Sequence, residues 1–185
     1  PRFNQIKTET DPSGYTTAYT YDYEEDRGQV GYLIHIEYPA VEDQFGVLRT
    51  PTVSYAYNDW GQMKTVTNTI GTVTRYVYTQ GVPDEASDGG TPLFAPGVTP
   101  VPGLLTQVIH DYGGANLTTT YTNFNAFGQP ELVSQPGGRA AVTYAYDLNG
   151  RIVQETDALG VITRHEYDAA GNLIQKIEDY TPDGV

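Results

Sequence analysis

The side chains that could do chemistry in this chain are three histidines and many carboxylates, because the sequence contains no cysteine. Without cysteine there is no thiol catalysis, no disulfide and no Cys-ligated metal. His35, His110 and His165 lie far apart in the sequence, so a metal site would require the fold to bring them together. Nucleophile-elbow and Walker-type motifs are also absent. We therefore interpret the histidines as positions on strands and predict no catalytic residue, no metal site and no cofactor.

Acidic side chains are plentiful enough to raise the question of glycoside hydrolysis, which needs a pair of Asp or Glu residues. Asp22, Asp147, Asp157 and Asp168, however, fall at the turn positions of a repeat. A catalytic pair should not recur in every repeat. The acidic run at 24–26 lacks the alternation of an EF-hand loop and is typical of a solvated turn. A hydrolase and a calcium site are therefore the weaker alternatives.

The balance of charge excludes two kinds of partner. Ten Lys and Arg stand against 23 Asp and Glu, which gives a net charge of −13 at pH 7. A surface of this charge repels phosphate backbones and anionic lipid headgroups. No stretch approaches the roughly 18–20 apolar residues that a membrane helix needs. We therefore predict no nucleic-acid partner and no membrane span.

The composition favours strands over helices. The chain has 16 Tyr, which suits a pleated and half-buried surface, and 20 Gly and 12 Pro, which interrupt helices every few residues. No long stretch shows apolar residues at helical spacing. The chain is therefore predicted to be all-β.

The main signal in the sequence is an internal repeat of about 21 residues. Each unit ends in an aromatic residue, a short polar turn and a glycine, and carries a second glycine upstream of its aromatic pair. We interpret all of these residues as structural positions of the repeat. The aromatic positions are Tyr21, Tyr57, Tyr78, Phe124, Tyr146 and Tyr167. The closing glycines are Gly61, Gly128, Gly150 and Gly171, and the upstream glycines are Gly14, Gly71, Gly138 and Gly160.

Each unit is predicted to form two strands and two turns. In the last unit, residues 161–167 alternate as a strand, 168–171 reverse the chain, 172–177 return, and 157–160 form the opposite turn. Asp at the start of a turn accepts backbone hydrogen bonds, and glycine at its end permits a positive φ. The predicted fold is an antiparallel meander of hairpins that forms a curved ribbon, with tyrosines stacked along one face.

The pattern Y-D-x-x-G, followed by a β-forming stretch and D-x-x-G, resembles the YD-repeat or rearrangement-hotspot (RHS) family. The resemblance covers most of the chain and is densest at 129–178, where 146–152 (Y-D-L-N-G-R-I) and 167–173 (Y-D-A-A-G-N-L) follow the pattern residue for residue. It implies a ribbon that spirals into a hollow RHS-type β-shell. In bacterial toxin complexes and secreted polymorphic toxins such a shell encloses a separate C-terminal toxic segment. Similar repeats occur in large animal adhesion proteins.

From this resemblance we expect a structural, non-enzymatic section of a shell in a large protein that is secreted or lies at the bacterial cell surface. The expected partners are flanking repeats of the same polypeptide and an enclosed toxin or other cargo segment. The alternative is an extracellular module that binds glycans or cell-surface proteins through exposed tyrosines, because sugar rings stack on aromatic rings.

We expect residues 1–185 to be a single RHS region with two insertions, and a section of a longer shell. The smaller insertion covers 39–51, and the larger covers 80–103, where five Pro and five Gly in 24 residues predict a loop. Asn58 and the pair at 124–125 (Phe-Asn) depart from the repeat pattern. Both ends of such a ribbon would present unpaired strand edges that flanking protein has to cover.

Overall fold

The computed structural model describes residues 4–24, 30–79, 103–138 and 141–178. Within these ranges almost all regular structure is β-strand, with two short 3₁₀ turns, η1 (Asp22–Glu24) and η3 (Pro136–Gly138). The chain divides into two compact units, which are described separately. The first contains residues 1–76 and 110–116, and the second contains 77–109 and 117–185.

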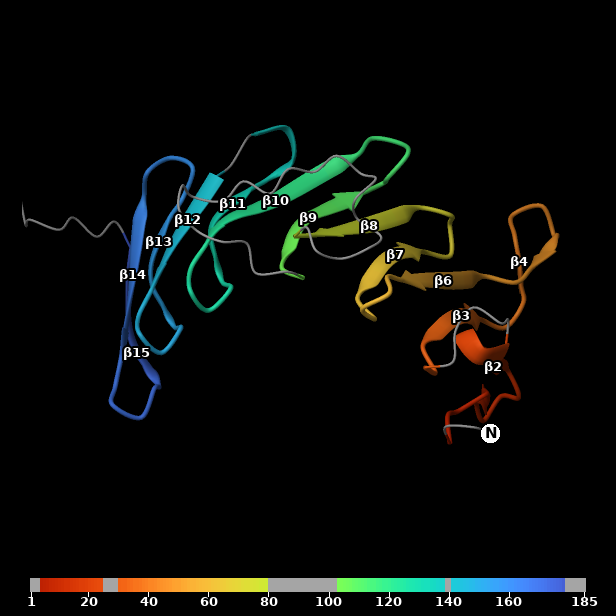
Figure 1. The fold of residues 1–185 in the computed structure, drawn as a ribbon. Coiled ribbons are helices and arrows are strands. Elements are labelled where there is room, and N and C mark those ends of the chain that lie inside the picture. The colour runs from red at the N-terminus through yellow and green to blue at the C-terminus, as the bar shows by residue number, and fades with distance from the viewer. Residues whose placement is uncertain (1–3, 25–29, 80–102, 139–140, 179–185) are drawn as a thin grey trace, which may run out of the picture. The chain divides into compact units, whose positions relative to one another are not determined.

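The first unit is an antiparallel meander with one added hairpin (Figure 1). Its strands neighbour one another in the order β1, β2, β3, β6, β7, β8, and β8 continues into the second unit. Between β3 and β6 the chain forms a separate two-stranded hairpin, β4–β5. The strands are β1 (Thr8–Thr10), β2 (Thr16–Tyr21), β3 (Leu33–Glu37), β4 (Val41–Glu42), β5 (Leu48–Arg49), β6 (Thr52–Tyr57), β7 (Met63–Thr67) and β8 (Val73–Tyr78).

The second unit continues the same plan. Its strands follow one another in chain order from β9 to β15, and every pair from β10 onward is antiparallel. The strands are β9 (Leu105–His110), β10 (Leu117–Phe124), β11 (Pro130–Ser134), β12 (Ala141–Tyr146), β13 (Ile152–Thr156), β14 (Ile162–Tyr167) and β15 (Leu173–Glu178).

One type of turn joins most of these strands, and its residues explain why the chain reverses there. In the turn after β12, the Asp147 carboxylate accepts hydrogen bonds from the backbone N–H groups of Asn149 and Arg151, both at 2.9 Å. The Gly150 N–H donates to the Asp147 carbonyl at 3.0 Å, and Gly150 has a φ of 76°. A type I turn closed by a glycine in the left-handed region matches the twist of a hairpin. The same turn occurs at 11–14, 43–46, 58–61, 68–71, 125–128, 157–160 and 168–171.

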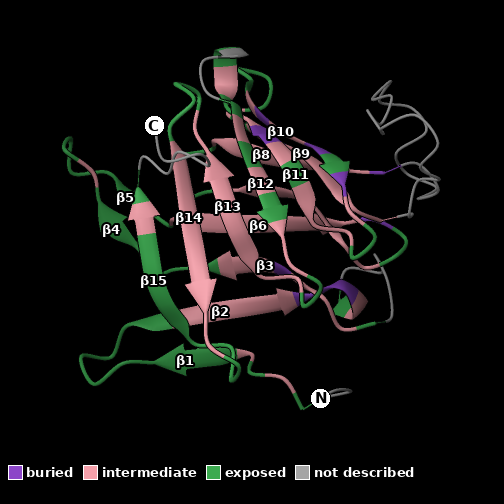
Figure 2. Ribbon diagram, turned by 90° about the vertical axis from the view of Figure 1, so that its left-hand side faces the viewer, coloured by how far each residue is buried: buried purple, intermediate pink, exposed green. Residues whose placement is uncertain are grey.

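The sheet of each unit has no second layer of described residues packed over it. All six residues of β6, and all six of β14, are half-buried. β1 is exposed throughout and β15 nearly so, as the green strands of Figure 2 show. Among the described residues, the buried apolar side chains are Tyr21, Ile34, Val77, Val108, Phe124 and Val133. Stability must therefore come largely from contacts between neighbouring strands rather than from a thick core.

The predicted fold class is confirmed, since the described chain is an open antiparallel meander of hairpins. The β4–β5 hairpin lies within the predicted insertion at 39–51. Most of the predicted insertion at 80–103 lies outside the described residues. Before β12, the glycine in the left-handed region is Gly137, with a φ of 77°, while Gly138 ends the 3₁₀ turn.

Candidate functional site

The aromatic residues of the repeat and its closing glycines lie along one edge of each sheet, and the upstream glycines Gly14, Gly71 and Gly160 lie along the other. At one edge, each turn directly follows a Tyr or Phe; these turns begin at residues 22, 58, 79, 125, 147 and 168. We call this edge the tyrosine edge. The opposite edge carries the turns that begin at residues 11, 68 and 157. The tyrosine edge is where consecutive hairpins contact one another through side chains, and it is the candidate functional feature of the repeat.

Four tyrosine hydroxyls connect the end of a strand to the segment that precedes that strand in the sheet. Tyr146 at the end of β12 donates a hydrogen bond to the carbonyl of Pro130, which begins β11, at 2.8 Å. Tyr167 at the end of β14 donates to the carbonyl of Ile152, which begins β13, at 2.9 Å. The same bond recurs in the first unit, from Tyr21 to Ile6 at 2.8 Å and from Tyr57 to Leu33 at 3.0 Å. We call this hydrogen bond the tyrosine tie.

The tie occupies the place where two strands stop pairing. β13 and β14 pair only through three residues near the opposite edge, ending at Gln154 and Arg164. β11 and β12 likewise pair through three residues, ending at Leu132. The carbonyl at the start of each return strand therefore has no backbone partner on that side. An unpaired carbonyl is costly where water is excluded, and the tyrosine hydroxyl satisfies it.

Burial of the tyrosine rings also affects their ionisation. Burial raises the pKa of Tyr57 and of Tyr146 above the ordinary value, and neighbouring Tyr55 and Tyr144, respectively, add to the effect. Both hydroxyls therefore stay protonated and able to donate at neutral pH.

The carboxylates of Asp147 and Asp168 are held in the charged form by their hydrogen bonds. The pKa of Asp147 is lowered first by the backbone N–H of Arg151 and then by its side chain, whose Nε lies 2.7 Å away. The pKa of Asp168 is lowered by the side-chain amide of Asn172 and by its backbone N–H. Hydrogen bonds to a carboxylate favour its ionised form. These aspartates thus have a complete set of local partners, as turn-forming residues should.

Turn glycines fall into two structural classes. At the opposite edge, a Cβ added to Gly14, Gly71 or Gly160 would meet no atom within 4 Å. At the tyrosine edge, a Cβ on Gly61 would lie 2.8 Å from Cζ of Tyr32, and one on Gly128 would lie 2.9 Å from Leu104. A Cβ on Gly150 would lie 3.2 Å from Gln129, and one on Gly171 would lie 3.5 Å from Arg151. Gly61, Gly128 and Gly150 therefore combine a positive φ with close approach of another residue, whereas a Cβ on Gly171 would make an ordinary van der Waals contact.

The approaching residue always comes from the preceding tyrosine-edge turn. Gln129, directly after the turn at 125–128, donates its side-chain amide to the Gly150 carbonyl at 2.7 Å. Arg151 pairs with Asp147 and lies over the ring of Tyr167, 4.6 Å from its centroid. Each tyrosine-edge turn in these cases is thus covered by the residue that follows the previous one.

A backbone hydrogen bond closes the base of each tyrosine-edge turn, whatever the turn contains. The Asp147 N–H donates to the carbonyl of Arg151 four residues later at 2.9 Å. The equivalent bond joins Asp22 to Tyr32 at 2.9 Å, and Thr79 to Leu104 at 2.7 Å. The Leu104 N–H also donates to the hydroxyl of Thr79, which is fully buried. The turn after Tyr78 therefore closes at Leu104.

The three histidines lie on different strands, and the two in the first unit have different partners. His35 contacts Ser54 at 3.0 Å and His110 contacts Thr74 at 3.4 Å. His165 lies on β14, in the second unit. Among the described residues no group of three metal-ligating side chains could hold an ion, and no helix has the length and hydropathy needed to cross a membrane.

Sequence reasoning identified the tyrosines and glycines as repeat positions but missed the residue after each closing glycine. That position holds Gln62, Gln129, Arg151 or Asn172, all long or polar side chains, in the turns of standard length. Their shared position after the glycine was the available signal. The role of Phe124 also differs, because it is buried and has no hydroxyl with which to form a tie.

Part of the chain matches a known repeat family, and its fold is similar to that of solved structures. Residues 124–162 and 146–185 match the family model for the RHS Repeat, and no curated protein sequence matches the chain. The Tc holotoxin pore of Photorhabdus luminescens has a similar fold, with a TM-score of 0.58 and 16% identity over 89% of this chain.

Two crystal structures of related complexes show the same similarity. TcdB2-TccC3-TEV matches with a TM-score of 0.62 and 16% identity over 95% of this chain. TcdB2-TccC3-Cdc42 matches with a TM-score of 0.60 and 15% identity over 94%. In all three structures the match covers 8% of the other chain. The resemblance to the YD-repeat family is thereby confirmed: residues 124–185 match the RHS Repeat model, and the chain has the β-fold found in these Tc toxin structures.

Proposed function

We propose that this chain is a structural, non-enzymatic section of an RHS-type shell that encloses a toxin or other cargo segment of a large secreted bacterial protein. The observation that carries the proposal is the tyrosine tie, which recurs with the same partners at the start and end of successive hairpins. In these four places the preceding segment of the sheet supplies the carbonyl that the tyrosine hydroxyl needs. A sheet built by this rule can be extended one hairpin at a time, as a wall requires.

The burial pattern supports a wall rather than a compact enzyme. Both faces of the inner strands are only half-buried, so the sheet separates two sides instead of covering a core. The acidic side chains serve the turns, where their partners are backbone N–H groups and neighbouring side chains. The proposed mechanism is exclusion: the wall keeps an enclosed polypeptide away from proteases until delivery.

The proposal is tested in the full polypeptide that contains this segment, detected with an antibody raised against residues 1–185. We expect a mass several times the 20.3 kDa of this chain. Limited proteolysis should leave a segment outside the repeats protected, and Gly150→Val should expose it by forcing a β-branched residue into positive φ. Leu148→Ala is the matched control, since Leu148 lies in the same turn and is 92% exposed.

The outcomes separate the two functional hypotheses. A polypeptide near 20 kDa, or a larger one with no protected segment, would contradict the shell and favour the alternative of an extracellular binding module. That module would then have to bind glycans on an array and lose this binding on Tyr→Ala substitution.

A further inference from the structure

The last described strand of the second unit, β15, has the pairing pattern of an inner strand. It pairs with β14 through Leu173 and residues 175–178, and no described strand lies beyond it in the sheet. Its equivalent one hairpin earlier, β13, pairs with β12 in the matching register and is half-buried at all five residues. In β15, by contrast, Leu173 is 53% exposed and Ile174 is 64% exposed (Figure 2). The difference arises because β13 has β14 beside it.

Four other strands show what pairs with an edge of this kind. The return strands β3, β7, β11 and β13, which follow tyrosine-edge turns, each pair with the next strand of the sheet through three residues. These residues are 35–37, 65–67, 132–134 and 154–156. In each case the partner residues are the first three of the next antiparallel strand. The matching positions of β15, counted from the residue opposite the tyrosine, are 175–177.

The next strand also has a fixed place for its aromatic residue. The partner strands β6, β8, β12 and β14 are each six residues long and end in tyrosine, three positions after the last paired residue. Three of these tyrosines, Tyr57, Tyr146 and Tyr167, form ties to the first residue of the preceding return strand. In β15 that first residue is Leu173. Its carbonyl is therefore the acceptor for a further tie.

We propose that the outer edge of β15 docks a further hairpin of the same repeat, whose first strand pairs in antiparallel register with residues 175–177. That strand has six residues and ends in tyrosine, and its hydroxyl donates to the carbonyl of Leu173. Asn172 then lies against the closing glycine of the docked hairpin, as Gln129 lies against Gly150. The inference deepens the proposed function and rests on it, because it names the neighbour of this section of the wall and the sequence that the neighbour needs.

The tie distinguishes this occupant from a second copy of the chain docked through an end strand. Any extended segment can form main-chain hydrogen bonds with an exposed strand edge. A tyrosine three residues beyond the paired segment also satisfies the Leu173 carbonyl. Neither β15 (L-I-Q-K-I-E) nor β1 (T-E-T) contains a tyrosine. Two chains paired through these strands would therefore leave that carbonyl without the donor that it has in the repeat.

The test appends a copy of residues 162–178 to the end of the full 1–185 chain, so that residues 179–185 serve as the connection. NMR hydrogen exchange compares residues 175–177 with and without the copy. The amides of these residues that point away from β14 should exchange about tenfold more slowly or better, because they gain hydrogen bonds. The carbonyl carbon of Leu173 should also shift in the spectrum. Tyr167→Phe in the copy should abolish this shift and reduce the protection about fivefold, as expected for one lost hydrogen bond.

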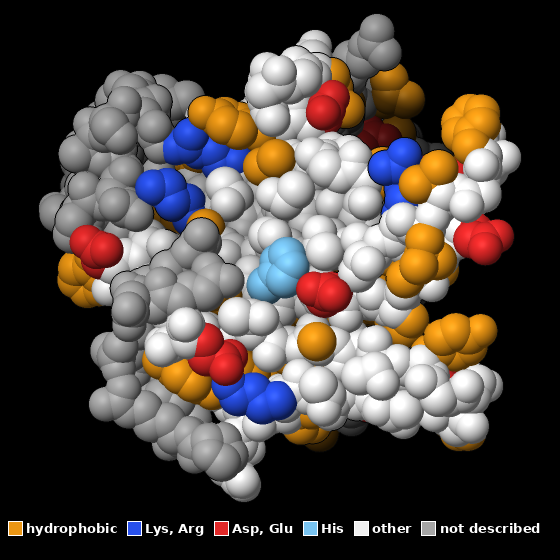
Figure 3. All heavy atoms as spheres, turned by 90° about the vertical axis from the view of Figure 1, so that its right-hand side faces the viewer, with side chains coloured by type: hydrophobic (Ala, Val, Ile, Leu, Met, Phe, Trp, Pro, Cys, Tyr) orange, Lys and Arg blue, Asp and Glu red, His pale blue; other side chains and the backbone are white. Residues whose placement is uncertain are grey.

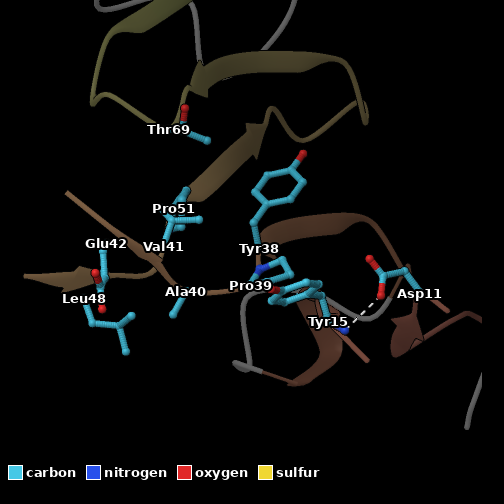
Figure 4. A pocket seen from close by; sticks show the side chains of 10 residues that line it. All are labelled: Asp11, Tyr15, Tyr38, Pro39, Ala40, Val41, Glu42, Leu48, Pro51 and Thr69. Carbon is cyan, nitrogen blue, oxygen red and sulfur yellow. Dashed lines mark hydrogen bonds between the residues drawn. The ribbon is translucent and has the colours of Figure 1, made fainter. Parts of the chain in front are cut away.

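Exposed apolar surface elsewhere in the chain supplies a control. In the first unit a hollow beside the β4–β5 hairpin is lined by Tyr38, Val41 and Leu48, among others (Figure 4). Figure 3 shows hydrophobic side chains exposed in groups on that side of the molecule. A copy that merely adheres to apolar surface would contact such places. Leu48→Ser should therefore leave the exchange of residues 175–177 unchanged, and a copy of scrambled sequence should give no protection.

Slow exchange at residues 175–177, together with the tyrosine-dependent shift at Leu173, is the expected result. Unchanged exchange, equal protection by the scrambled copy, or a Leu173 shift that survives Tyr167→Phe would overturn the proposal. Protection of 175–177 in the unextended chain that rises with concentration, with a dimer in analytical ultracentrifugation, would overturn it in favour of a second copy. The experiment contains no cargo, so its failure is distinct from a loss of protease protection in the full polypeptide.

Discussion

The two classes of turn glycine make a sharp prediction for the pair Gly61 and Gly71. Both glycines close turns that begin with Asn, and their φ values are 77° and 83°. Gly71→Ala should cost about 1–2 kcal/mol, the usual penalty for an L-residue in the left-handed region. Gly61→Ala adds a clash, because its Cβ would lie 2.8 Å from Cζ of Tyr32, with the hydroxyl closer still.

The extra cost follows from what Tyr32 contacts. Its ring stacks on Tyr57 with centroids 4.7 Å apart, so a movement of the ring away from Gly61 disturbs this contact. Overpacking of this kind typically costs about 1–3 kcal/mol, of which a lost aromatic pair accounts for about 0.5–1.5 kcal/mol. Gly61→Ala should therefore destabilise the chain by about 1–3 kcal/mol more than Gly71→Ala does.

Urea unfolding measures the difference, followed by the fluorescence of Trp60 and by circular dichroism. Tyr32→Ala supplies the decisive comparison: in its background the cost of Gly61→Ala should fall to that of Gly71→Ala, because the clashing ring is gone. Equal costs of the two glycine variants in the native background would refute the close-approach argument. So would a double-mutant cycle with no coupling between Tyr32 and Gly61.

Three further predictions concern the ties and the turns. Tyr146→Phe should lower the free energy of unfolding by about 1 kcal/mol in a urea titration, because the Pro130 carbonyl loses its donor. The control is Tyr144→Phe, which should cost less, because the hydroxyl of Tyr144 has no hydrogen-bond partner among the described residues. Asp147→Asn should be tolerated better than Asp147→Ala, since Asn keeps the oxygen that accepts the turn N–H groups, and equal melting temperatures would contradict this. The free energy of unfolding should fall at both pH extremes. The contribution of Asp147 is fully present above about pH 4 and is lost as the pH drops through the lowered pKa of its carboxyl in the folded chain. The contribution of Tyr146 is present below about pH 10 and is lost as the pH rises through the raised pKa of its hydroxyl, and urea titrations at acid and alkaline pH measure both losses.

The sequence was sufficient for the hairpins because their turns depend on local chemistry. Asp147 and Gly150 are three residues apart, so the acceptor and the left-handed residue could be read directly from the chain. The ties could not be read in this way, because the bond from Tyr146 to Pro130 depends on the register of two strands and on the point where they stop pairing. The pairing of β4 with β5 could not be read either, because it lies in an insertion whose path no repeat predicts.

The base hydrogen bonds explain how such a wall can carry insertions without losing its register. Asp22 and Tyr32, ten residues apart, form the same backbone bond as Asp147 and Arg151, four residues apart. At the opposite edge, the β4–β5 hairpin enters between β3 and β6, and the tie from Tyr57 still reaches the start of β3 at 3.0 Å. The ties and base bonds therefore fix the strands, while the segments between them are free to vary in length. Insertions such as the β4–β5 hairpin can then be added without changing the order in which the strands of the sheet pair.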